Sequence, residues 1–95
     1  MKKSTMPMRF NIIRQLYRAR DGLTPKTVYE RICTEYAGER QCSEEEVDRQ
    51  LMSLKTIGLV EVASAHLTPQ GLLESSYRIT DYGVERAQRT IGKYL

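Results

Sequence analysis

Residues 43–63 read SEEEVDRQLMSLKTIGLVEVA, and the hydrophobic period changes within this stretch at Gly58. Before Gly58, apolar residues recur at the spacing of one helix face, namely Val47, Leu51 and Leu54. After Gly58, apolar and polar residues alternate with the period of a strand. The stretch therefore predicts a helix over residues 43–57 that is followed directly by a strand over residues 59–63.

The first turn of this helix carries the signals of a helix start. Ser43 and Glu46 have the spacing of a capping box, in which the serine hydroxyl caps the backbone and the glutamate side chain returns to the serine N–H. The three glutamates at residues 44–46 also place negative charge at the positive end of the helix dipole. These features predict a well-defined start for the helix.

Two helices are predicted before this stretch. The first covers residues 6–20 and ends at Asp21-Gly22. Its predicted buried face consists of Phe10, Ile12, Ile13, Leu16 and Tyr17. Its predicted solvent face consists of Asn11, Arg14, Gln15 and Arg18. The second helix covers residues 25–36 and starts at Thr24-Pro25, because threonine caps well and proline suits the first helical position.

After residue 63, turn residues and a second alternating stretch predict a returning strand at residues 77–79, so that residues 64–74 form a long hairpin tip. Thr80-Asp81 then starts a last helix. Its apolar face is formed by Val84, Ala87, Ile91 and Leu95. Residues 1–5 are predicted to be a flexible tail, and residues 6–95 a single domain.

This order of three helices, a hairpin and a last helix resembles the winged helix-turn-helix superfamily, especially its PadR-like and MarR-like regulators. Three stretches carry the resemblance: residues 23–36, residues 43–61 and residues 77–83. It implies an α+β fold, mostly helical, with a three-helix core, a two-stranded β-hairpin wing and a C-terminal helix. It also implies a small transcriptional regulator that binds double-stranded DNA.

In such regulators the second helix of the motif enters the major groove and the wing touches the backbone or minor groove. The resemblance gives that role to helix 43–57, with Arg49 reading guanine edges and Arg40 and Lys55 contacting phosphates. The complete set of candidate DNA-contacting residues is Arg40, Ser43, Arg49, Met52, Ser53, Lys55, Thr56, His66 and Gln70.

The distribution of charge does not follow the usual pattern of a DNA-binding winged helix. Residues 1–26 carry a net charge of +6, residues 27–77 one of −5 and residues 78–95 one of +2, within a total of +3. The hairpin from Leu59 to Tyr77 contains no lysine or arginine. Since DNA affinity depends on cationic groups, Arg14 and Arg18 of the first helix form an alternative basic face.

A second function therefore stays open, that of a winged-helix protein-interaction module, an adaptor or an inhibitor of the kind that mobile elements encode. The acidic motif helix and the base-free hairpin fit this function better than they fit DNA binding. Candidate residues for a protein partner or a homodimer lie near the two ends of the chain: Met6, Met8, Ile91, Tyr94 and Leu95.

Other classes of function find no support in the sequence. His66 is the single histidine and there is no Cys-x-x-Cys pair, so no metal site or cofactor is predicted. No set of nucleophile, base and acid indicates an enzyme. No apolar run approaches the roughly 20 residues of a membrane span, and no apolar signal core follows the basic N-terminus. We expect a cytoplasmic, non-enzymatic protein.

Overall fold

The computed structural model describes residues 6–38 and 42–95. The tail predicted for residues 1–5 and the candidate Arg40 lie outside the described residues. The helical elements are α1 (Met8–Arg18), α2 (Pro25–Ile32), η1 (Cys33–Tyr36), α3 (Glu44–Thr56), α4 (Asp81–Ile91) and η2 (Gly92–Tyr94). The strands are β1 (Val60–Leu67) and β2 (Leu73–Ile79), which pair in one antiparallel sheet.

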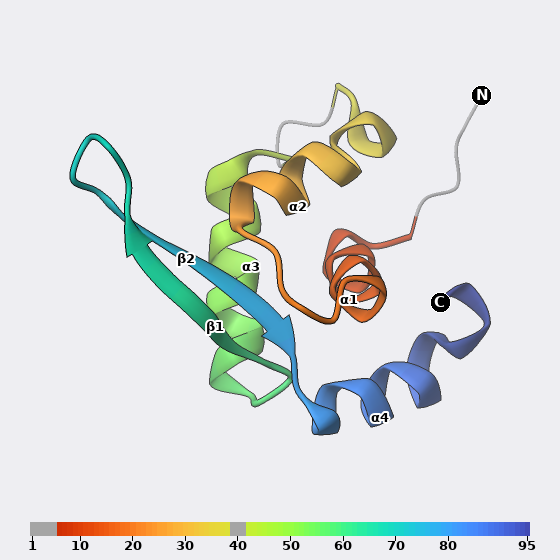
Figure 1. Cartoon of the computed structure of the whole chain (residues 1–95). Helices are drawn as coiled ribbons and strands as arrows, with labels where there is room; N and C mark the ends of the chain where they lie inside the picture. Colours follow the sequence, from red (N-terminus) through yellow and green to blue (C-terminus); the bar gives the residue numbers. More distant parts are fainter. Residues whose placement is uncertain (1–5, 39–41) are drawn as a thin grey trace.

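Figure 1 shows α1, α2 and α3 grouped as a helical core, with the β1–β2 hairpin projecting from it on one side and α4 extending on the other. One cluster of buried side chains joins all these elements. It includes Ile12 and Leu16 of α1, Val28 and Ile32 of α2, Val47, Leu51 and Leu54 of α3, Val60, Tyr77 and Ile79 of the hairpin, and Ala87 and Ile91 of α4. The predicted winged-helix architecture is confirmed, with the hairpin as the wing.

The three predicted helix starts are confirmed by side-chain caps. The hydroxyl groups of Thr24, Ser43 and Thr80 each accept a hydrogen bond from the backbone N–H three residues later. The second half of the predicted capping box is wrong, because the Glu46 carboxylate accepts from the side chains of Arg49 and Gln50 instead. The helix predicted over residues 25–36 also tightens into the 3-10 turn η1 from Cys33 onwards.

The predicted solvent face of α1 is partly wrong. Asn11 is fully buried and Gln15 nearly so, whereas Phe10, which was expected in the core, is 36% exposed. Asn11 is accommodated because its amide finds polar partners inside the molecule, among them the carboxylate of Glu35 at 2.6 Å. Apolar spacing alone does not reveal such a partner, since it lies on a different element.

The wing is longer and its tip shorter than predicted. The strands pair from Val60 opposite Ile79 to Leu67 opposite Leu73, with one irregularity between Val62 and Ser64. Residues 64–67 and 73–74 therefore belong to the strands and not to a long tip. The small side chains of this part of the wing weaken the alternating pattern in the sequence, while the backbone ladder still forms.

The corner between the wing and α4 is closely packed. The Thr80 hydroxyl donates to the carbonyl of Gly58 at 2.8 Å, and the Thr80 N–H donates to the carbonyl of Leu59 at 3.0 Å. A Cβ atom on Gly83 would lie 2.2 Å from the Leu59 carbonyl oxygen and 2.7 Å from Cγ1 of Ile79. Glycine at position 83 therefore lets α4 approach the start of the wing.

We expect Gly83→Ala to lower the free energy of unfolding by about 1–3 kcal/mol, because the added methyl group forces the backbone of this corner to move. Urea denaturation measures the change. The matched control is Gly92→Ala, at a helical position where a Cβ would meet nothing within 4 Å among the described residues. The control should be neutral or slightly stabilising. Equal losses in the two variants would contradict the packing argument.

Candidate nucleic-acid interface

Helix α3 buries one side against the core and exposes the other. Arg49, Met52, Ser53 and Thr56 lie on the exposed side, and we refer to these four residues as the α3 crest. Lys55 is also exposed, next to the crest. Ser43 is half-buried, and its hydroxyl is engaged as the cap of the helix. The structure thus brings together five of the predicted DNA-contacting residues on the free surface of α3.

Arg49 is held by acidic residues of its own helix. Its guanidinium donates to the Glu46 carboxylate and lies 3.9 Å from the Glu45 carboxylate. Hydrogen bonds from Gln50 and then from Arg49 lower the pKa of Glu46 below its ordinary value, so this carboxylate stays ionised at neutral pH. Arg49 therefore has to leave these partners before it can contact a base or a phosphate.

Arg9 of α1 is a candidate that the sequence analysis missed. Its guanidinium donates to Oε1 of Gln50 at 2.8 Å and to Oγ of Ser53 at 3.0 Å. These contacts place a second positive charge along the α1 side of the α3 crest. Arg9 lies 41 and 44 positions from its two partners in the chain, so only the packing of α1 against α3 reveals the pairing.

The other two candidates, His66 and Gln70, belong to the wing and not to α3. His66 lies across the strands from Glu74, with its Nε2 3.2 Å from the Glu74 carboxylate. Gln70 is exposed in the turn at the end of the wing. Since a glutamate stands beside His66, the wing presents no net positive charge at this point.

Between the wing and α3 lies a groove with a volume of about 470 Å³. Its α3 wall is acidic and carries Glu44, Glu45 and Asp48. The start of α2 contributes Pro25 and Lys26. The wing side contributes Thr68, Leu72, Leu73, Glu74, Ser75 and Tyr77. The first half of α3 therefore lines a groove that carries acidic and apolar side chains. The second half of α3 has no acidic residue, because none occurs between Asp48 and Glu61.

Tyr77 and Met52 connect the wing to α3 at the base of this groove. The Tyr77 hydroxyl donates to Sδ of Met52 at 3.8 Å. Burial, followed by the nearby charge of Asp48, raises the pKa of Tyr77 above its ordinary value, so the phenol stays neutral and keeps its proton for this contact.

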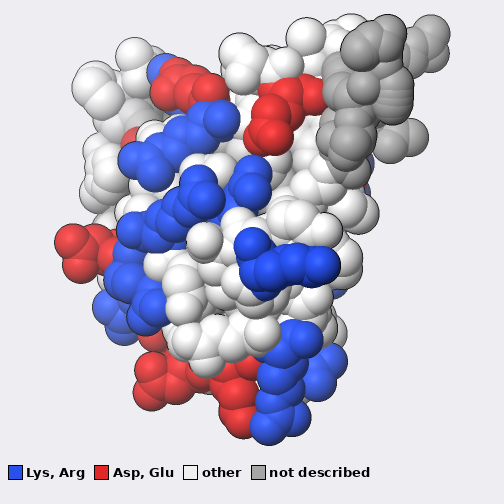
Figure 2. Space-filling view, turned by 90° about the vertical axis from the view of Figure 1, so that its right-hand side faces the viewer, with Lys and Arg blue, Asp and Glu red and all other residues white. Residues whose placement is uncertain are grey.

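Of the two arginines predicted to form the alternative basic face, Arg14 and Arg18, only Arg18 is on the surface. Arg18 is exposed, but the side chain of Arg14 is only 18% exposed. Arg14 donates to the Tyr94 carbonyl at 3.3 Å and to Oδ1 of Asn11 at 3.4 Å, and it lies 3.8 Å from Glu35. Figure 2 nevertheless shows many Lys and Arg side chains on the side of the molecule that carries α1 and α4.

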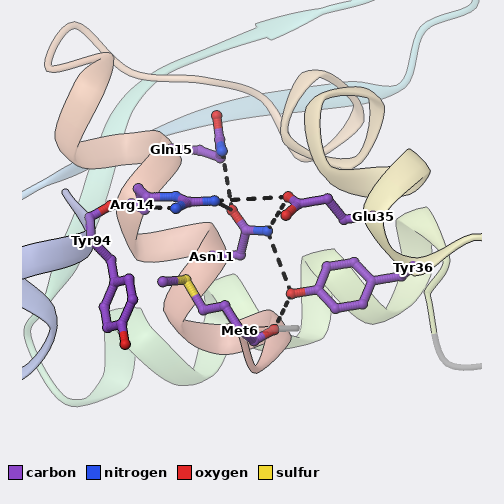
Figure 3. A network of polar contacts seen from close by, with 7 residues as sticks. All are labelled: Met6, Asn11, Arg14, Gln15, Glu35, Tyr36 and Tyr94. Carbon is purple, nitrogen blue, oxygen red and sulfur yellow. Dashed lines mark hydrogen bonds and ion pairs between the residues drawn. The ribbon is translucent and has the colours of Figure 1, made fainter. Parts of the chain in front are cut away.

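Figure 3 shows that Arg14 belongs to a network around the buried amide of Asn11. Asn11 donates to Glu35, and its Oδ1 accepts from Gln15 at 3.1 Å. The Tyr36 hydroxyl lies 3.4 Å from the Asn11 amide and donates to the carbonyl of Met6. Burial is the main cause that raises the pKa of Tyr36. The network is structural, because its members are engaged with each other.

One of the residues predicted for a partner or dimer interface is wrongly placed. Ile91 is 3% exposed and belongs to the core. Met6, Met8 and Leu95 are half-buried, while Tyr94 is 52% exposed. Met6, Ile91 and Tyr94 do border a second cavity of about 440 Å³ beside α1.

No protein-family model matches the chain, and a comparison with curated proteins gives no significant match. The solved structures that are similar to it include two transcriptional regulators. A transcriptional regulator homologue from Pyrococcus horikoshii OT3 superposes with a TM-score of 0.62 and 20% identity, over 93% of this chain and 76% of that chain. The PcaV transcriptional regulator from Streptomyces coelicolor, solved with its natural ligand, gives 0.61 and 25%, over 97% and 56%.

This likeness confirms the winged-helix fold inferred from the sequence. The resemblance to winged-helix regulators is confirmed at the level of the fold. The chain spans little more than half of the length of PcaV, and about three quarters of the Pyrococcus protein. Within residues 6–38 and 42–95, no helix is both long and apolar enough to cross a membrane, and no three metal-binding side chains form a cluster.

We expect Asn11→Ala to lower the free energy of unfolding by about 1–3 kcal/mol, because Gln15 and Glu35 lose a buried partner. Gln88→Ala, which removes an exposed hydrogen bond to Tyr17, should change it by less than about 0.5 kcal/mol.

Asn11→Asp keeps the shape of the side chain but places a carboxylate against Glu35. Relative to wild type at the same pH, its defect should therefore shrink as the pH falls from about 7 to 4. A defect that is independent of pH would contradict the proximity to Glu35.

Proposed function

We propose that this chain is a DNA-binding winged-helix regulator that places α3 in the major groove. The observation that carries the proposal is the position of Arg9 beside the α3 crest, where its guanidinium meets Ser53. Two arginines from different helices then serve one exposed surface, together with Lys55. The likeness in fold to two transcriptional regulators supports the same function by analogy.

The charges of α3 indicate how DNA would approach. Phosphates are repelled by Glu44, Glu45 and Asp48 in the first half of the helix, since DNA affinity rests largely on cationic neutralisation. The second half, with Arg49 and Lys55, is positive, and Arg9 adds to it. We therefore expect the phosphate contacts at the C-terminal half of α3, with Arg49 exchanging Glu46 for the DNA.

Few phosphate contacts are available to one copy of such a small domain. A homodimer would double them, as in many regulators of this architecture. Met6, Met8, Tyr94 and Leu95 remain the candidate residues for its interface. We place the protein in the cytoplasm, in a non-enzymatic role.

A salt titration of random duplex DNA, followed by fluorescence anisotropy, tests the proposal. We expect Arg9→Ala and Arg49→Ala each to weaken binding and to reduce the slope of log affinity against log salt by about 0.9, as for the loss of one phosphate contact. Arg89→Ala is the matched control, because Arg89 is also exposed and paired with a glutamate of its own helix, Glu85. It should leave binding unchanged.

Unlike the two arginine substitutions, Glu45→Gln should raise the affinity for duplex DNA. It removes a charge that repels phosphates, and it weakens the interaction that holds Arg49 on α3. Absence of binding by the wild-type protein at about 50–100 mM salt would refute the proposal, because a non-specific DNA binder still associates there. Equal losses in Arg89→Ala and Arg49→Ala would place the DNA on a different face.

We keep the protein-interaction module as the second candidate function, and the surface that we assign to it is the groove between the wing and the first half of α3.

A further inference from the structure

The wing has one polar face and one apolar face. In an antiparallel pair, residues directly opposite each other share a face, and successive residues alternate between the two faces. One face is closed by polar pairs across the strands: Ser64 with Ser76 at 2.8 Å, His66 with Glu74 at 3.2 Å and Glu61 with Arg78 at 2.8 Å. We call this the outer face.

The inner face is apolar and continues beyond the core. At the base of the wing it consists of Val60, Ile79 and Tyr77, which are buried against the helices. Towards the tip it continues through the small pair Ala65 and Ser75 to Leu67 and Leu73, which lie directly opposite each other. These two leucines are 68% and 70% exposed, and Leu72 in the turn is 66% exposed. Large apolar side chains gathered in this way on a surface are typical of an interaction site.

This apolar surface borders the acidic wall of α3. Leu72 and Leu73 line the same groove as Glu44, Glu45 and Asp48. Within the described part of the chain, neither Glu44 nor Asp48 has an ion-pair partner, and Lys26 is the only basic residue that lines the groove. Three carboxylates of α3 therefore share a space of about 470 Å³ with Leu72 and Leu73, whose neighbours on the wing side are Thr68, Glu74, Ser75 and Tyr77.

We infer that this groove binds a segment of a partner protein in which basic side chains stand beside large apolar ones. Charge complementarity selects the basic side chains, because an acidic segment or a nucleic acid in the groove would be repelled by Glu44, Glu45 and Asp48 in the first half of α3. The exposed leucines select the apolar ones, which would gain burial against the wing. The inference is independent of DNA binding through the α3 crest.

A second copy of this chain is a less suitable occupant, although its α1 and α4 side is basic (Figure 2). Contact between the groove of one copy and the opposite side of the next uses two different surfaces. Such a head-to-tail contact leads to open chains of molecules, or to a ring if the rotation between successive copies closes the assembly. A separate partner protein occupies the groove without this consequence.

The probe is a fluorescein-labelled synthetic peptide in which leucine and arginine alternate, titrated with the intact protein and followed by anisotropy. We expect saturable binding that is lost when the leucines of the peptide are replaced by serine, or its arginines by glutamate. The double variant Leu72→Ser/Leu73→Ser should weaken binding by about tenfold or more. Glu44→Gln/Asp48→Asn should weaken it and reduce its dependence on salt.

The matched control for charge is Glu30→Gln/Glu85→Gln, which removes two exposed acids of α2 and α4. It should leave peptide binding unchanged, and all variants should keep the circular dichroism spectrum of the wild type. Equal losses in the two charge variants, or binding unaffected by the leucine variant, would overturn the inference. So would sedimentation showing self-association that the leucine variant abolishes, because the occupant would then be a second copy.

The outcome is separable from that of the DNA experiment. Arg9→Ala should weaken duplex DNA binding and leave peptide binding unchanged, since Arg9 contacts α3 at Gln50 and Ser53, which do not line the groove. If Leu72→Ser/Leu73→Ser weakens DNA binding and has no effect on the peptide, the wing serves DNA and the inference is wrong.

Discussion

Two backbone hydrogen bonds between Leu23 and Tyr77 hold the wing to the helical core. The N–H of each residue donates to the carbonyl of the other at 2.8 Å. Gly22 permits this approach, because its φ is +113° and a Cβ there would lie 3.0 Å from the Tyr77 carbonyl oxygen. The exchange fixes Tyr77, whose side chain is buried and contacts Met52 of α3. The angle between the wing and α3, and with it the groove between them, depends on this point.

The same helix serves two surfaces of opposite character. Glutamates at the start of α3 suit the helix dipole and the Ser43 cap, so folding favours acidic residues there. Their charge makes the first half of α3 a poor partner for phosphates. The packing of α1 then brings Arg9 to the second half, where it supplies a positive charge that α3 itself lacks on that side. The requirement for a stable helix start therefore shifts the candidate DNA contacts along α3.

The order of elements and the three helix starts could be predicted from the sequence because their determinants are local. A cap such as Thr80 needs only a hydroxyl and a backbone N–H three residues away. The burial of Asn11 and the position of Arg9 could not be predicted, because each depends on a partner contributed by another helix. Ile91 was misassigned for a related reason, since apolar spacing does not tell a core contact from an exposed one.

The Asn11 network has a consequence for how the molecule opens. Through Tyr36 it holds the carbonyl of Met6, and through Arg14 it holds the carbonyl of Tyr94 (Figure 3). Segments from opposite parts of the sequence thus share one buried amide as a common anchor. When either segment detaches, water reaches Asn11 and the other segment loses part of its support. The two segments therefore belong to one cooperative unit of local unfolding, and their backbone amides should exchange hydrogen with solvent together.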